Sequence, residues 1–169
     1  MTRRYSDVEE LTAAHEMSQF DCGSDTQSEW LRDHALQAHR SGTSRVYVVR
    51  RLEDNSVVGF HALATGSVLP ANAPERVIRG TGRYDVSVIV LTRLGVDRSE
   101  QGRGLGRALV VHAFRQVSAA EIVGVRALLI HAEDETARSF YERLAEFEQS
   151  PTDDLHLYLL LKDIRRTLS

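Results

Sequence analysis

Three glycines at alternate positions interrupt the stretch VDRSEQGRGLGRALVVHAF, which runs from Val96 to Phe114. The apolar run YDVSVIVLTRLGV leads into it, and the apolar spacing after the glycines is typical of a helix. Glycines between a strand and a helix let backbone N–H groups approach a phosphate closely, because no Cβ stands in the way. The stretch therefore predicts an anion-binding turn at a helix N-terminus, although an ordinary glycine-rich turn would have a similar composition.

Two common phosphate-binding motifs do not fit this spacing. A nucleotide P-loop ends in Gly-Lys-Ser/Thr, whereas Gly106 is followed by Arg107 and Ala108. A dinucleotide-binding GxGxxG opens the first strand, turn and helix of a long domain, whereas these glycines are spaced GxGxG and lie past the middle of the chain. The pattern Gln/Arg-x-x-Gly-x-Gly/Ala does fit, through Gln101, Gly104 and Gly106. In that pattern, consecutive backbone N–H groups hold a pyrophosphate.

Composition narrows the class of protein. The chain has 169 residues, of which 42% are hydrophobic and 27% charged, so we expect a single globular domain over residues 1–169. A net charge of −3 argues against a globally basic nucleic-acid binder but leaves a local basic patch open. No apolar run is long enough for a membrane span, and the start MTRRYSDVEEL lacks the apolar core of a signal peptide. We therefore expect a cytoplasmic protein without membrane association.

The single cysteine, Cys22, excludes an internal disulfide and a cysteine-based zinc site. We expect it to be a small, half-buried side chain rather than a nucleophile, because the sequence identifies no paired histidine. No metal site is expected.

The order of the expected elements predicts an α/β fold with a mixed central sheet flanked by helices. Ser6 and Glu9 have the spacing of a capping box and predict a first helix over SDVEELTAAHEM, residues 6–17. A second helix is expected over residues 25–42, followed by two strands that turn at Asp54 and Asn55. The elements expected after these are a strand over 84–96, a helix over 107–121, a strand over 126–133, a helix over 134–144 and a closing strand over 154–164.

This order, together with the loop Gln101 to Gly106, resembles the GNAT N-acetyltransferase superfamily, and the resemblance covers nearly the whole chain. A second motif is ARSFYERL, residues 137–144, where enzymes of this superfamily often carry a tyrosine beside the coenzyme sulfur. Four segments look like the TacT-like branch: FDCGSDTQSEWL, SGTSRVYVV, LTRLGVDRSEQGRGLGRALV and SPTDDLHLYLLLKDIR. Members of that branch are toxins of bacterial toxin–antitoxin modules that acetylate the α-amine of aminoacyl-tRNA.

The resemblance implies a set of site residues. Acetyl-CoA would be the cosubstrate. Its acetyl and pantetheine portion would contact the backbone of the strand end, and its pyrophosphate would contact the glycine loop. The residues implied are Leu94, Gly95 and Val96 in the strand, and Gln101, Gly102, Arg103, Gly104, Leu105 and Gly106 in the loop. Tyr141 would be the catalytic acid that returns a proton to the departing thiolate. Judged without the resemblance, Phe140 and Tyr141 would more simply anchor a helix to the sheet.

No histidine stands out as a general base, since His61, His112 and His131 fall within expected strands or helices. An α-amine titrates at about 7.7 to 8.0 and needs little help to lose its proton, whereas a lysine amine near 10.4 would need a base. The missing base therefore favours an α-amine acceptor.

Three departures from the family pattern bear on activity. The usual Phe-Gly-Phe turn after FYER is replaced by LAEFEQSPTDD, which could displace Tyr141, and Gly95 stands where alanine is common. Because the chain is acidic overall, a tRNA-binding surface would have to be assembled locally from arginines. We single out Arg93, next to the active strand, and the pair Arg50 and Arg51 as candidate substrate-binding residues.

Three functions remain in competition. The first is a translation-blocking toxin neutralised by a small antitoxin of the ribbon-helix-helix type. The second is a GNAT enzyme that acetylates a small-molecule amine or a protein N-terminus. The third is a catalytically inactive module that serves as a binding partner. The sequence leaves a homodimer open and does not identify the preferred amino acid or tRNA.

Overall fold

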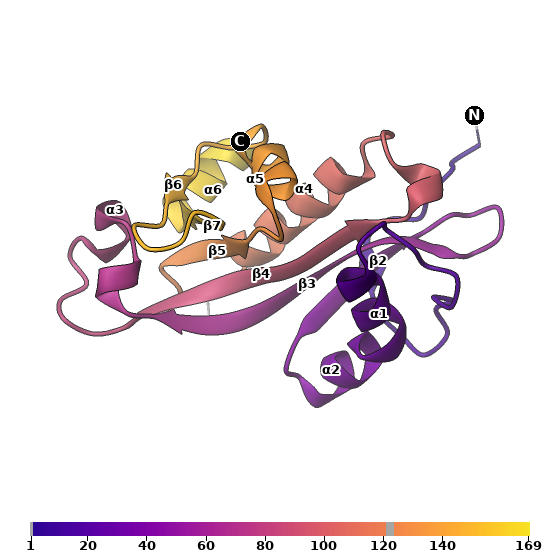
Figure 1. Ribbon diagram of the computed structural model, residues 1–169, viewed down its shortest axis with the longest axis horizontal. Coiled ribbons are helices and arrows are strands. Elements are labelled where there is room, and N and C mark those ends of the chain that lie inside the picture. The colour runs from indigo at the N-terminus through magenta and orange to yellow at the C-terminus, as the bar shows by residue number, and fades with distance from the viewer. Residues whose placement is uncertain (1, 121–123) are drawn as a thin grey trace. The chain divides into compact units, whose positions relative to one another are not determined.

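The computed structural model describes residues 2–120 and 124–169 (Figure 1). Contacts divide the chain into two compact units, one formed by the residues up to Ala64 together with Arg93–Ala113, the other by Thr65–Thr92 and Phe114–Ser169. The elements that contribute to both are β3 (Val57–Val68), β4 (Val86–Val96) and α4 (Leu105–Ser118). Each unit has a hydrophobic core of its own. A single domain over residues 1–169 stays a prediction.

The first unit contains a β-hairpin with a short edge strand. Its strands are β1 (Glu9–Glu10), β2 (Arg45–Arg50) and the first part of β3. β2 and β3 are antiparallel, with Arg45 opposite Leu63 and Arg50 opposite Val57. The connecting turn places Asn55 at a φ of 62°, a left-handed conformation that asparagine tolerates better than most residues. The hairpin predicted from Asp54 and Asn55 is confirmed.

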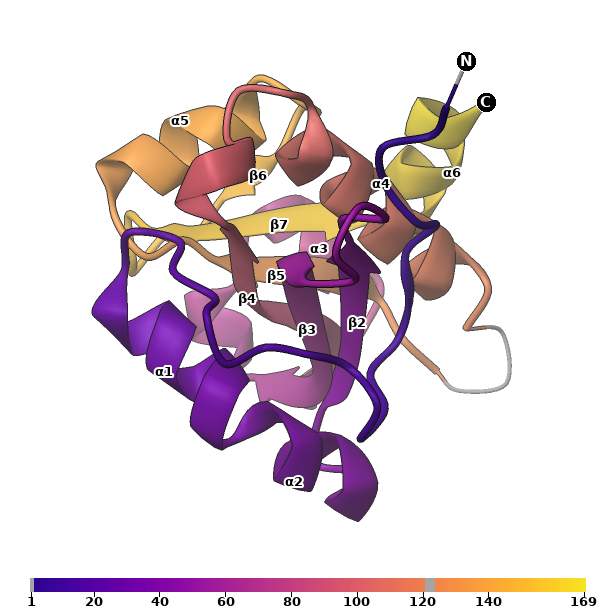
Figure 2. The ribbon, with the colours of Figure 1, turned by 90° about the vertical axis from the view of Figure 1, so that its right-hand side faces the viewer.

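Two helices of this unit lie against β2 and β3 (Figure 2). They are α1 (Asp25–Asp33) and α2 (Ala35–Ser41). α1 begins after Ser24, whose side chain accepts a hydrogen bond from the backbone N–H of Gln27, and α2 ends at Gly42 with a φ of 79°. The helix predicted over residues 25–42 is therefore confirmed, but it is divided at His34, where φ is −126°. Their packing buries Leu31, Ala35, Val46, Val48 and Phe60.

The helix predicted over residues 6–17 is wrong. The structure has β1 at Glu9–Glu10 instead, paired antiparallel with β2. Ser6 does not cap a helix, because its hydroxyl accepts a hydrogen bond from the backbone N–H of Arg50 at 2.9 Å. Leu11 donates its N–H to Val46 at 3.0 Å and is almost fully buried. Pairing with the edge of β2 satisfies the backbone and buries apolar surface, and both gains override a local capping signal.

The second unit contains the other part of β3 and of β4, followed by three strands. These are β5 (Ala127–His131), β6 (Glu148–Gln149) and β7 (His156–Leu160). β4 and β5 are parallel, with Val88 opposite Ala127, whereas β7 is antiparallel to both β5 and β6. Across the chain the strand order is β1-β2-β3-β4-β5-β7-β6, which confirms the predicted mixed sheet with helices.

The helices of the second unit only partly follow the sequence prediction. They are α3 (Glu75–Ile78), the end of α4, α5 (Glu135–Glu142) and α6 (Leu161–Leu168). α4 and α5 were expected, but Glu121, the predicted end of the former helix, lies outside the described residues. The closing strand predicted to Ile164 ends at Leu160 and gives way to α6. Ile164 is fully buried from a helical position, and Asp163 accepts a hydrogen bond from Arg76 at 3.0 Å. No helix in the described part of the chain is long and apolar enough to span a membrane.

Candidate active site

The end of β4 presents its two faces to different surroundings. Leu94 and Val96 pack with a cluster that includes Val58 and Leu109. Gly95 faces the other way, where a Cβ would lie 3.0 Å from the Phe60 ring and 3.1 Å from Cys22 Sγ. Alanine at this position would therefore require its neighbours to shift. This close packing explains why glycine stands here where the family pattern commonly has alanine. Gly95 itself is buried and lies within the extended strand β4.

In the loop after β4, hydrogen bonds hold the first residues, and free space lies beside the glycines that follow. Asp97 caps the short helical turn Arg98–Glu100 by accepting a hydrogen bond from Ser99, and it also accepts one from the backbone N–H of Asp21 at 2.9 Å. Gly102 and Gly104 then have φ values of 80° and 87°. A Cβ on either glycine would meet nothing within 4 Å. These glycines are needed for the left-handed backbone, and they leave free space beside the loop.

α4 begins directly after the second of these glycines, at Leu105. The N–H of Ala108 donates to the carbonyl of Gly104 at 3.1 Å, so the N–H groups of the first turn have no carbonyl partner within the helix. Such a turn carries a partial positive charge and binds anions. The geometry fits the pyrophosphate of a coenzyme at the predicted residues Gln101, Gly102, Arg103, Gly104, Leu105 and Gly106.

The side chain of Gln101 braces the loop. Its Nε2 donates to the carbonyl oxygen of Cys22 at 3.1 Å and to that of Val96 at 3.0 Å. The glutamine of the motif thus ties the loop both to the segment before α1 and to the end of β4. Its side chain therefore serves the loop's shape, and the backbone N–H groups remain the candidates for binding a pyrophosphate.

The arginines of this region differ in how strongly they are engaged. Arg98 lies 3.3 Å from Asp21 and is largely exposed, and Arg103 lies 3.3 Å from Glu100. Arg50 is held by Glu9 at 2.5 Å and by Asn55 at 2.8 Å. Arg98 and Arg103, which flank the glycines, thus each lie next to one carboxylate, whereas Arg50 would have to leave both of these partners to bind a phosphate.

Arg51 is engaged by two carboxylates, those of Asp54 at 2.9 Å and Glu100 at 3.1 Å. Arg93 is placed differently: its guanidinium lies over the Trp30 ring, 4.7 Å from the centroid, and donates to Gln27 at 3.1 Å. Among the three arginines singled out from the sequence, Arg93 is thus held by an aromatic ring and an amide, whereas Arg50 and Arg51 are held by carboxylates.

Tyr141 belongs to α5, in the second unit. The helix begins after Asp134, whose carboxylate accepts a hydrogen bond from the N–H of Ala137 at 2.8 Å. Tyr141 is buried, and its ring packs edge-on against Phe140 at 5.4 Å. Burial, and then the charge of Glu133, raise the pKa of Tyr141 well above its usual value. The phenol therefore stays protonated, which is the state that a proton donor requires.

The turn that follows Tyr141 forms a short strand. Its residues Glu148–Gln149 are β6, and the Phe147 ring packs against Phe114 at 6.4 Å. The departure from the family's Phe-Gly-Phe turn thus keeps one aromatic anchor without a glycine.

Nothing in the structure marks His61, His112 or His131 as a general base. His61 is fully buried, and its Nε2 lies 2.9 Å from His112 Nδ1. Burial, and then the neighbouring charge of His112, lower the pKa of His61 to about 3. His131 stacks on His156 at 4.1 Å, and burial lowers its pKa as well. Nor do the described residues include three metal-ligating side chains close enough to hold a metal ion.

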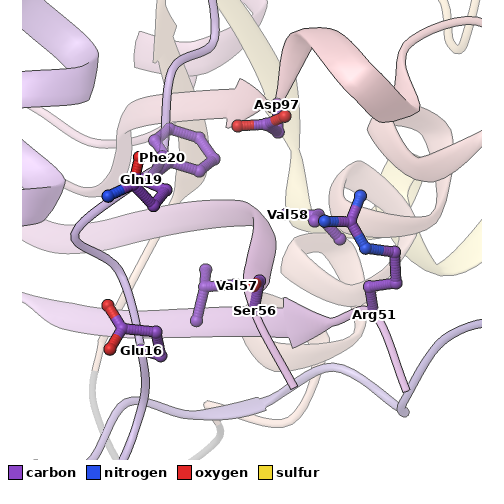
Figure 3. A pocket seen from close by; sticks show the side chains of 8 residues that line it. All are labelled: Glu16, Gln19, Phe20, Arg51, Ser56, Val57, Val58 and Asp97. Carbon is purple, nitrogen blue, oxygen red and sulfur yellow. The ribbon is translucent and has the colours of Figure 1, made fainter. Parts of the chain in front are cut away.

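A pocket of about 330 Å³, open solvent included, lies in the first unit and is lined in part by Asp97 at the start of the loop (Figure 3). Arg51, Asp97 and Glu16 lie on different sides of it, around Val57 and Val58. None of the predicted coenzyme-binding residues lines it, so it is not assigned to the coenzyme.

Glu100 was missed by the sequence analysis, although it lies next to Gln101. It is fully buried and is bonded by side chains from three segments of the chain. A charged residue inside a glycine-rich turn is ordinarily solvated, and only the three-dimensional arrangement shows its partners. The contact of Trp30 with Arg93 was missed for the same reason.

Comparison with known proteins agrees with this geometry. The sequence pattern of the acetyltransferase (GNAT) family matches residues 8–147. A tRNA-acetylating toxin of Mycobacterium tuberculosis (strain ATCC 25618 / H37Rv) is 49% identical over 164 residues, which cover 96% of this chain and 93% of that protein. The predicted resemblance to GNAT toxins is confirmed.

Two solved structures share the fold. AtaT complexed with acetyl-methionyl-tRNAfMet is 27% identical with a TM-score of 0.85, covering 98% of this chain and 99% of that one. A tyrosine-to-phenylalanine mutant of AtaT, bound to the C-terminus of the antitoxin AtaR and to acetyl-CoA, is 27% identical with a TM-score of 0.83, covering 99% of each chain.

Proposed function

Because this chain belongs to the GNAT acetyltransferase family, we propose that it transfers the acetyl group of acetyl-CoA to the α-amine of aminoacyl-tRNA and so blocks translation. The observation that carries the proposal is the 49% identity to a tRNA-acetylating toxin over nearly the whole chain. The fold alone would not suffice, since one fold hosts many acceptors.

Coenzyme binding falls to the loop and the strand end. Gln101, Gly102, Arg103, Gly104, Leu105 and Gly106 would hold the pyrophosphate, chiefly through backbone N–H groups at the start of α4. Leu94, Gly95 and Val96 would bind the acetyl and pantetheine portion. A backbone N–H of this strand end, directed at the thioester oxygen, would stabilise the negative charge that develops there.

The proposed reaction requires an acid catalyst but no base from the protein. The neutral α-amine attacks the thioester carbon, the C–S bond breaks, and Tyr141 donates its proton to the departing thiolate. The amine loses its extra proton to water, and the Tyr141 phenolate regains a proton from water before the next turnover. The ester carbonyl next to an aminoacyl amine lowers the amine's pKa below the usual 7.7 to 8.0, so no base is required. This supports an aminoacyl-tRNA acceptor, because the buried His61 pairs with His112 and its lowered pKa makes it a poor base for a lysine amine.

Substrate binding and partners follow from the same proposal. Arg93, and less readily Arg50 and Arg51, would contact the phosphates of tRNA. A cognate antitoxin would neutralise the toxin, as AtaR binds AtaT; its ribbon-helix-helix type and a toxin homodimer both stay predictions. An aminoacyl-tRNA acceptor would imply an activity in the cytoplasm, which stays a prediction.

A second candidate is acetylation of a small-molecule amine or a protein N-terminus. It is favoured by the neutralisation of Arg50 and Arg51 by carboxylates and by the net charge of −3, both of which limit phosphate binding. Cell-free translation distinguishes the two. A toxin stops protein synthesis only when acetyl-CoA is present, and addition of freshly charged tRNA restores synthesis for a short time. Undiminished synthesis with an active enzyme supports the second candidate.

A further inference from the structure

The carboxylate of Glu100 is a buried charge directly before the glycine loop. Its side chain is fully buried. Arg4 donates to Oε1 at 2.9 Å and to Oε2 at 3.2 Å, and Arg51 donates to Oε1 at 3.1 Å. Arg103 lies 3.3 Å from Oε2, and the Tyr5 hydroxyl also donates to this oxygen. A buried carboxylate is costly unless it is paired and fully hydrogen-bonded, and here these groups converge on it.

The charge of Glu100 is held firmly. Burial alone would raise its pKa, but hydrogen bonds from Arg4, Tyr5 and Arg51 outweigh burial and lower the pKa to about 2. Glu100 is therefore ionised throughout the pH range of ordinary assays.

The partners of Glu100 come from different parts of the first unit. Arg4 and Tyr5 belong to the N-terminal segment, Arg51 follows β2 at the hairpin, and Arg103 stands between the two left-handed glycines of the loop. The carboxylate of Glu100 thus links the start of the loop to two segments that are far away in the sequence. It also engages Arg103, one of the predicted coenzyme-binding residues.

The loop has little else to fix its shape. Gln101 and Asp97 hold its start, but Gly102 and Gly104 have no side chains and occupy conformations that other residues rarely adopt. Ordering a flexible loop on binding costs free energy, so a loop held in advance binds its ligand more tightly.

We propose that Glu100 is a positioning residue for the coenzyme: it holds the loop and Arg103 in the binding geometry, and it makes Arg4 and Tyr5 contribute to acetyl-CoA affinity without touching the coenzyme. This rests on the proposed function of the loop as the pyrophosphate site. When acetyl-CoA binds, Arg103 stays beside Glu100, and Arg4 and Arg51 keep this carboxylate paired.

The test compares Glu100→Gln with Glu9→Gln. Glu9 is a partly buried carboxylate of the first unit, and its ion pairs are with Arg50 and His15 rather than with the loop. Calorimetric titration should show acetyl-CoA bound at least about tenfold more weakly by Glu100→Gln, which is about 1.4 kcal/mol. Its KM for acetyl-CoA should rise while kcat at saturation stays near wild type. Glu9→Gln should change neither constant, although both variants lower thermal stability.

A double variant adds a second measurement. Arg4→Met alone should weaken acetyl-CoA binding, and it should add little to Glu100→Gln, because both changes remove the same interaction. If Glu100→Gln does not fold, the same titration of Arg4→Met and Arg51→Met decides the question. Unchanged affinity in both, or a folded Glu100→Gln with wild-type affinity, overturns the proposal. Gly104→Glu is the reference: if it too binds acetyl-CoA normally, the loop is not the coenzyme site and the proposed function of the loop fails with it.

Discussion

The guanidinium of Arg93 lies over the ring of Trp30, 4.7 Å from its centroid, two residues before Gly95 in β4. Cation–π contacts of this kind hold an arginine in place without neutralising its charge. The charge that we assign to tRNA binding is therefore fixed beside the strand end that we assign to the thioester.

Reversal of this charge should affect one substrate only. Arg93→Glu should weaken acetylation of aminoacyl-tRNA, increasingly so as salt is raised, because phosphate contacts depend on counterion release. Acetylation of a free amino-acid ester should change much less. The measurement is kcat/KM for both substrates at low and high salt. Equal losses on both substrates would show that Arg93 supports the fold rather than tRNA binding.

The Arg50 and Arg51 pair gives a different expectation. Reversing both to glutamate places new carboxylates beside Glu9, Asp54 and Glu100, so we expect a loss of stability along with a loss of tRNA acetylation. Thermal unfolding recorded beside the transfer assay separates the two effects. A stable double variant with full activity on charged tRNA would remove both arginines from the substrate-binding set.

The role of the glycine loop can be tested by comparing alanine substitutions at two glycines with similar backbone conformations. Gly104 and Gly42 both have positive φ values with open space around the Cβ position, but Gly42 ends α2. Gly104→Ala and Gly42→Ala should therefore cost similar stability, and only the former should weaken acetyl-CoA binding. Gly104→Glu should abolish binding, because a carboxylate would fill and repel the pyrophosphate position. A folded Gly104→Glu with normal calorimetric affinity contradicts the loop assignment.

Loss of the Tyr141 hydroxyl should affect turnover alone. Tyr141→Phe keeps the ring and its packing on Phe140, so coenzyme affinity should persist while kcat falls by roughly 10²-fold, the usual scale for losing an acid. Tyr158→Phe is the matched control, since this buried tyrosine of the same unit donates to the carbonyl of Asn72 at 3.1 Å. That variant should lose stability without losing turnover. If Tyr141→Phe stays within a few-fold of wild type, water supplies the proton.

The buried histidine pair predicts a pH dependence of stability. Folded His61 takes up a proton only near pH 3, whereas its usual pKa is 6.5, so the unfolded chain binds an additional proton between these values. The stability that depends on neutral His61 is therefore fully present above about pH 6.5. Below that pH the free energy of unfolding falls, by up to about 1.4 kcal/mol per pH unit. Urea unfolding from pH 5 to 8 should show that the free energy of unfolding depends less steeply on pH in His61→Gln than in wild type. An equal pH dependence in the two proteins would contradict this assignment.

Much of the fold could be predicted from local signals, and the failures have a common cause. The alternation in β2 to β4 and the glycines at residues 42, 102 and 104 mark strands and turns within a few residues of chain. Ser6 and Leu161 misled the prediction, because pairing with β2 and burial of Ile164 depend on segments far along the chain. Residues named by a motif, such as Gln101 and Tyr141, could be singled out, whereas Glu100 could not, since three of its partners lie 49 or more residues away.

The most direct test of the central claim is acetyl transfer to charged tRNA. The protein is incubated with radiolabelled acetyl-CoA and total aminoacylated tRNA, with uncharged tRNA and a free amino-acid ester in parallel. Among the RNA samples, we predict label only in the charged tRNA. Mild alkali should release this label as an N-acetylated amino acid, and Tyr141→Phe should strongly reduce its amount. Label on the ester or on another small amine, with none on charged tRNA at any salt concentration, would contradict the account.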